Sequence, residues 1–142
     1  MKTALYSTVV LAAFLMALPK PAAGQDESSF DDFYASFKNA VMQKDEAALR
    51  KVMAARFSFI RATNVAPDVV FQGLALDHGR QWANLQQAVQ GQPVLYRGRQ
   101  GRVFYVLPCT PTDVIYNCAV VFGQDAQGGW RWKGMVMPTR SG

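Results

Sequence analysis

From Pro93 onward the sequence is strand-like, and its strands are apolar on both faces. In the segments 102–107 and 114–122, apolar side chains occupy successive positions rather than alternate ones. An antiparallel sheet with one face in water would carry polar residues at every second position. Both faces of this sheet must therefore be covered. Helices can cover one face, and we expect a second subunit, or a sheet that curls around a pocket, to hide the other.

The part of the chain before Pro93 has helical periodicity. Apolar residues recur at spacings of three and four between Phe30 and Val41, which predicts an amphipathic helix ending near Gln43. The pattern then predicts a helix capped by Asp45, a short strand at 57–60, a loop at 62–75, a helix from Asp77 to Gly91, and strands at 94–98, 102–107, 114–122 and 130–137. Helices followed by an antiparallel meander indicate an α+β fold, with N-terminal helices packed on a curved four- to five-stranded sheet.

The first 24 residues are typical of a secretory signal peptide. Lys2 precedes a charge-free apolar run at 4–18, and small residues follow at 22–24. The alternative is a membrane anchor, but this run of 15 residues is shorter than the roughly 20 that span a bilayer. We therefore expect cleavage near Gly24, a single domain at 25–142 in the periplasm or secreted, and no stable membrane anchor after cleavage.

The net charge argues against a nucleic-acid partner. Removing Lys2 and Lys20 from 15 basic residues leaves 13 against 10 acidic ones, a net charge of +3. The sequence also clusters Arg97, Arg99 and Arg102 around a hairpin tip, where such side chains could contact an anionic partner. An exported domain rarely meets nucleic acid, and charged hairpin tips are common, so we interpret the cluster as a solvated turn.

Cys109 and Cys118 are the two cysteines of the chain. In an oxidising compartment, a close and even pair indicates a disulfide, and the end of one strand and the body of the next can bring the two together. Two buried free thiols are the alternative. The pair has neither redox spacing nor histidine neighbours, so we expect no metal there.

The order of the expected elements resembles the nuclear transport factor 2-like superfamily (SnoaL-like, cystatin-like fold). The resemblance rests on the segment 30–37 with Ala40–Val41 and Asp45–Leu49, which is similar to that family's opening helix pair, and on 129–135, which is similar to its last strand. It implies a curved sheet that forms a conical cavity, frequent dimers, and members that are enzymes, carriers or interaction subunits. The catalytic acids of the enzymes do not map onto this chain, since its acids suit helix starts, turns and a loop.

Aromatic side chains are the candidate pocket residues. Their rings could orient a small apolar ligand in the cone, and the alternative is packing in the core or a dimer interface. The candidates are Tyr34, Trp82, Tyr96, Tyr105, Tyr116, Trp130 and Trp132.

His78, beside Asp77, is the only histidine and the one candidate general base. Adjacent helical positions point about 100° apart, so we interpret it as an exposed residue at a helix start. We expect no catalytic residue, no metal and no cofactor. The sequence favours an exported binding or accessory protein; the alternatives are an isomerase- or hydratase-type enzyme and an interaction subunit that binds through its sheet face, with a homodimer as one form of that contact.

Overall fold

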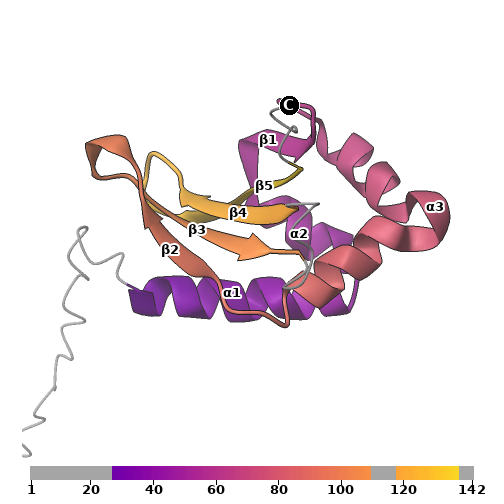
Figure 1. Ribbon diagram of the computed structural model, residues 1–142, viewed down its shortest axis with the longest axis horizontal. Helices are drawn as coiled ribbons and strands as arrows, with labels where there is room; N and C mark the ends of the chain where they lie inside the picture. Colours follow the sequence, from indigo (N-terminus) through magenta and orange to yellow (C-terminus); the bar gives the residue numbers. More distant parts are fainter. Residues whose placement is uncertain (1–26, 110–117, 138–142) are drawn as a thin grey trace, which may run out of the picture.

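The computed structural model describes residues 27–109 and 118–137, and Figure 1 shows helices arranged along and beside an open sheet. The expected leader at 1–24 lies outside the described residues. Helices α1 to α3 and strand β1 come first, and four further strands follow. The predicted α+β class is confirmed.

The two N-terminal helices lie where the sequence predicts them. Helix α1 (Glu27–Met42) buries its apolar stripe, with Phe30, Phe37 and Val41 at most 2% exposed. Helix α2 (Glu46–Val52) begins after Asp45, whose Oδ1 accepts a hydrogen bond from the Ala48 N–H at 3.1 Å. This bond satisfies one of the free amides at the helix start, so Asp45 is the N-cap that the sequence predicts.

Strand β1 (Met53–Ile60) is longer than the predicted strand at 57–60, because it begins directly after α2. Met53 is already in register with Trp132 of the last strand. Residues 53–56 carry no alternating apolar pattern, so only the backbone pairing reveals that they belong to the strand.

The predicted loop at 62–75 is right only for its first part, because residues 62–66 lie outside the helices and strands and α3 covers the rest. Helix α3 (Pro67–Ala88) begins at Pro67, because proline is favoured in the first helical turn, where its missing N–H costs nothing. Gly73 is tolerated inside the helix because the ring of Phe59 packs against its backbone. The helix breaks at Leu76–Gly79, where Asp77 and His78 have positive φ angles of 54° and 57°. Asp77 therefore lies in a left-handed kink rather than at a helix start.

The sheet is mixed rather than purely antiparallel, with the order β1-β5-β4-β3-β2. Strands β2 (Val94–Arg97), β3 (Val103–Pro108), β4 (Ala119–Gln124) and β5 (Trp130–Val136) form the expected antiparallel meander, with a 3₁₀ turn at Arg99–Gly101. Strand β1 pairs with β5 in parallel, because the α3 crossover returns the chain to the far side of the sheet. The strand predicted at 114–122 is described only from residue 119, and residues 110–117 lie outside the described residues.

The two faces of the sheet have different surroundings. We call the face toward α1 the inner face, since Phe30 and Phe37 of α1 lie against Phe122 and Trp132 of the sheet. The outer face is the opposite one. The register places these outer-face residues opposite one another: Val94 with Val106, Tyr96 with Phe104, and Val106 with Val121.

A register shift in the β4–β5 pairing lies between Val121 and Phe122, which pair with Gly134 and Trp132. Lys133 is therefore the extra residue of a β-bulge. Gly134 also faces β1, and a Cβ built there would lie 2.6 Å from the Ser58 carbonyl oxygen. The close parallel pairing of β1 and β5 thus requires glycine at this position.

We expect Gly134→Ala to lower the free energy of unfolding by about 1–3 kcal/mol, because the new methyl group meets backbone that cannot move aside. Gly123→Ala is the matched control, since a Cβ there would meet only the flexible stem of Lys133. Urea unfolding of both variants measures the difference. Equal losses at the two glycines would contradict this account.

Candidate functional site

Four of the predicted pocket residues share one ring cluster on the inner face, joined through the rings of Phe30, Phe37 and Phe122: Tyr34, Tyr105, Trp130 and Trp132. The ring centroid of Tyr105 lies 3.6 Å from that of Phe30 in a stacked arrangement, and Trp130 lies 5.4 Å from Tyr105 and 5.0 Å from Phe30. Tyr105 and Trp130 are 8% and 7% exposed. Among the described residues, these side chains pack against other rings.

Trp132 and Trp82 are also buried in the core. Trp132 has no exposed surface, packs edge-on against Phe37 and Phe57, and donates from Nε1 to the Gly134 carbonyl at 3.2 Å. Trp82, on α3, stacks on Phe71. Trp132 therefore continues the inner-face ring cluster through Phe37, whereas Trp82 contributes to the same core from α3.

Tyr34 joins α1 to the end of α3. Its hydroxyl lies 2.9 Å from the Val89 carbonyl oxygen and 3.1 Å from that of Gly91, so its proton is shared between two backbone acceptors. Burial raises the pKa of Tyr34 to about 12. The hydroxyl thus serves to anchor a helix end and stays protonated across the physiological range.

Tyr96 lies on the outer face, where it is 48% exposed and stacks on Phe104 with ring centroids 5.8 Å apart. The sheet therefore separates Tyr96 from the ring cluster of the inner face. Tyr116 lies outside the described residues.

His78 is exposed at the kink of α3. Its neighbour Asp77 forms an ion pair with Arg80 at 3.5 Å on the surface. In the ranges 27–109 and 118–137, no group of three or more His, Cys, Asp or Glu residues could hold a metal ion. The acid–histidine pair therefore lies on the surface, with no further acid or histidine grouped around it in those ranges.

The predicted disulfide is confirmed: Cys109 and Cys118 are joined, with their Cα atoms 5.1 Å apart. Both are buried, and the Cys109 N–H donates to the Cys118 carbonyl at 2.9 Å. The bond thus fastens the end of β3 to the start of β4.

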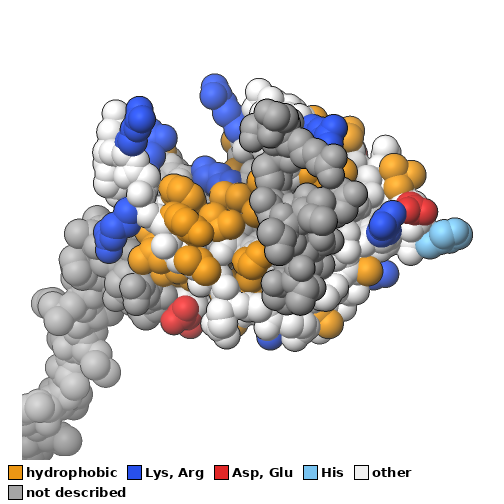
Figure 2. All heavy atoms as spheres, in the orientation of Figure 1, with side chains coloured by type: hydrophobic (Ala, Val, Ile, Leu, Met, Phe, Trp, Pro, Cys, Tyr) orange, Lys and Arg blue, Asp and Glu red, His pale blue; other side chains and the backbone are white. Residues whose placement is uncertain are grey.

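The outer face carries an apolar patch. Figure 2 shows hydrophobic side chains gathered over β2, β3 and β4, with Lys and Arg side chains beside them. Val94 and Tyr96 are about half exposed, at 49% and 48%. We define the outer patch by its partly exposed residues, which are Val94, Tyr96, Phe104, Val106 and Val121.

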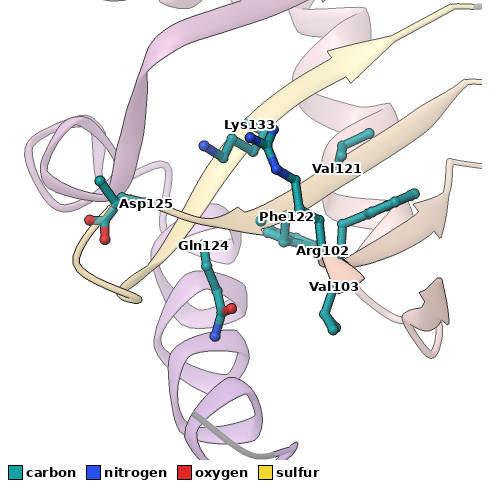
Figure 3. Close-up of a pocket in the computed structure, with 10 residues that line it drawn as sticks. Arg102, Val103, Val121, Phe122, Gln124, Asp125 and Lys133 are labelled. Atoms are coloured by element: carbon teal, nitrogen blue, oxygen red, sulfur yellow. The ribbon is translucent and has the colours of Figure 1, made fainter. Parts of the chain in front are cut away.

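A cleft of about 550 Å³ adjoins this patch and is lined by Phe104, Val121 and Gly123 together with Arg102 and Lys133. Figure 3 shows Arg102, Lys133 and Val121 on one side of the sheet, whereas Val103 and Gln124 point to the other. The cleft therefore has an apolar floor and two cationic side chains.

A second cleft of about 640 Å³ continues from the first toward β1. Lys133, Asp125 and Ala126 line both clefts, and the second adds Lys51 and Arg56. The surface beside the outer patch is therefore rich in positive charge.

Asp125, which lines both clefts, is held at the β4–β5 turn. Its carboxylate accepts from the N–H groups of Gly129 at 2.8 Å and Gln127 at 3.0 Å, and from Arg131 Nε at 3.0 Å. The hydrogen bond from the Gly129 N–H, followed by the one from Arg131, lowers the pKa of Asp125 below its usual value. The Asp125 side chain therefore stays ionised at neutral pH and is a weak base.

This shift in pKa predicts a pH dependence of stability. Because the folded-state pKa lies below the unfolded-state value of about 3.9, the stabilisation is complete above that value and is lost as the pH falls through the folded pKa. Asp125→Asn should therefore have a lower free energy of unfolding than the parent at pH 6. This difference in free energy should become smaller below about pH 4. Denaturant unfolding of both proteins between pH 6 and 2 measures the difference in free energy. A difference that does not change with pH would contradict the lowered pKa of Asp125.

Part of the outer patch and its clefts can be predicted from the sequence. The apolar pattern on both strand faces predicts that one face lacks a helical cover, and Arg102 is among the arginines at the predicted hairpin tip. The roles of Lys133 and Asp125 have no local signal, because they depend on the bulge and on the close pairing of β4 with β5.

None of the described helices is long and apolar enough to cross a membrane. No family model, curated protein or solved structure matches this chain. The similarity to the nuclear transport factor 2-like superfamily therefore stays a prediction.

Proposed function

We propose that this protein is an exported, non-enzymatic binding protein whose ligand or partner docks on the outer face of the sheet. The observation that carries the proposal is the contrast between the faces. The inner face is packed with rings from α1 and the sheet, whereas the outer face presents the outer patch beside two clefts. Contiguous exposed apolar surface of this kind is typical of binding sites.

The disulfide supports export, because disulfides persist in oxidising compartments and are rare in the cytosol. A leader at 1–24 would supply the route. The order of elements, which is the order expected for the nuclear transport factor 2-like fold, supports the similarity to that superfamily as part of the same proposal.

The electrostatics of the clefts favour binding over catalysis. Asp125 is the carboxylate that lines them, and its lowered pKa makes it a poor proton acceptor near neutral pH. The candidate base His78 lies instead at the exposed kink of α3. This arrangement supports a carrier or interaction protein ahead of the enzyme alternative.

Site-specific photocrosslinking tests the proposal. The photoreactive residue p-benzoylphenylalanine is placed at Tyr96 and, as a control, at Leu76, an apolar residue that is 68% exposed on α3. After irradiation in the producing cells, we expect a discrete adduct at position 96 and none at 76, read by gel and intact mass. Equal adducts at both positions, or none at 96, would overturn the proposal. An adduct with a second copy of this chain would assign the site to a homodimer, one of the two covers predicted for the apolar strand face.

A further inference from the structure

Among the residues that the structure describes, the two cationic side chains of the first cleft have no acidic partner. Within the described part of the chain, neither Arg102 nor Lys133 forms an ion pair or a side-chain hydrogen bond, although both line the same cleft. Figure 3 shows both side chains reaching to the same side of the sheet. Two like charges at one cleft repel each other, and an anion placed between them would be attracted to both.

The nearby acid does not neutralise them. The Asp125 carboxylate is already engaged by Arg131 and by two backbone N–H groups. Arg131 in turn donates from its Nη1 atom to the Lys51 carbonyl at 2.9 Å. Asp125 and Arg131 are therefore paired with each other. The positive charge of Arg102, Lys133 and the adjoining Arg56 remains available to an anionic ligand.

The floor of the cleft is apolar and depends on Gly123. A Cβ at Gly123 would lie 3.1 Å from Lys133 Cε and 3.3 Å from its Cγ, so the lysine stem lies flat across the glycine. The stem covers apolar surface and leaves the ammonium group at the rim. Phe104 and Val121 continue the floor, and Tyr96 stacks on Phe104 beyond it. The cleft and the adjoining outer patch thus form one surface that is positively charged on one side and apolar on the other.

The shape favours a separate small molecule. The volume of about 550 Å³ is within the range of about 300–1,000 Å³ typical of small-molecule sites. The lining residues come from β3, β4, β5, the turn at Asp125–Ala126 and Arg102 before β3. An alkyl chain can lie along the apolar floor while an acid group reaches the cationic rim.

We propose that this cleft binds a single-chain anionic amphiphile, with its carboxylate between Arg102 and Lys133 and its alkyl chain over Val121, Phe104 and Tyr96. This inference rests on the proposed function and names its ligand class. A second copy of the chain would instead bring more positive charge to the cationic rim.

Calorimetric titration of the purified protein with dodecanoate tests the inference, and dodecyltrimethylammonium is the probe of equal chain length and opposite charge. Both are used below their micelle-forming concentrations. We expect saturable one-to-one binding of dodecanoate and none of the cation. Arg102→Gln and Lys133→Gln should each weaken dodecanoate binding about tenfold, the effect of losing one charge-assisted hydrogen bond. Arg61→Gln removes one positive charge outside both clefts and should leave binding unchanged.

Equal binding of the two probes, or equal affinity in Arg102→Gln, Lys133→Gln and the parent, would overturn the inference. Binding to phosphatidylglycerol vesicles without binding of free dodecanoate would overturn it in favour of a membrane surface. Far-UV circular dichroism checks that each variant is folded. If dodecanoate fails to bind while the adduct at position 96 persists, the ligand class is wrong and the proposed function stands; loss of both overturns both.

Discussion

Trp132→Ala is expected to lower the free energy of unfolding by about 3–5 kcal/mol, the usual cost of deleting a large ring from a packed core. The side chain has no exposed surface and contacts the rings of Phe37 on α1 and Phe57 on β1. Its Nε1 also donates to the Gly134 carbonyl beside the bulge. One substitution thus removes the ring contacts that Trp132 of β5 makes with α1 and β1. Denaturant unfolding followed by far-UV circular dichroism measures the loss.

Val69→Ala is the matched control, because Val69 is 52% exposed on α3 and its truncation should change stability by less than about 0.5 kcal/mol. A loss at Trp132 as small as the loss at Val69 would mean that the inner face is loosely packed. The interior would then be open to a ligand, and the placement of the binding surface on the outer face would lose its main support.

The sequence predicts those parts of the fold where each residue's role depends on its neighbours in the chain. The stripe from Phe30 to Val41 and the cap at Asp45 are local signals, and both helices form as predicted. The same holds for the meander, since β2, β3 and β5 lie within a residue or two of their predicted bounds.

The parts that the sequence misses depend on contacts between distant segments. Pro67 and Gly73 are typical of a loop, yet the helix there is stabilised by packing of Val70, Phe71 and Leu74 into the core. The parallel pairing of β1 with β5 has no local signal either, because it joins residues about eighty positions apart. A tertiary contact overrides local propensity at both places.

The same contrast between local patterns and distant contacts applies to the candidate site. Apolar residues on both strand faces predict a face that the helices do not cover, and among the described residues the outer patch is partly exposed. However, the aromatic residue types do not tell which face a ring occupies. Tyr96 and Tyr105 are similar in sequence context, but their pairing across β2 and β3 places them on opposite faces of the sheet.

The second large effect is expected from the disulfide. Replacing both cysteines, as Cys109→Ala with Cys118→Ala, should lower the free energy of unfolding by about 2–3 kcal/mol. In the chain-entropy model the bond stabilises the fold by restricting the unfolded chain, and here it closes a short loop with a sequence separation of 9. Both side chains are buried at the junction of β3 and β4, so the double variant also loses packing there. Urea unfolding of oxidised parent and double variant measures the difference.

Reduction provides the control without any substitution. Treating the parent with a reductant should produce a loss of similar size, whereas the double variant should not respond, since its pair has no bond to break. Thiol labelling of denatured, unreduced protein from the oxidising compartment should find no free thiol. Two labelled cysteines would contradict both the bond and the argument for export that depends on it. The cysteines could instead be oxidised while reduction leaves the free energy of unfolding unchanged. In that case the β3–β4 pairing alone holds the junction. The disulfide would then indicate an oxidising compartment without stabilising the fold.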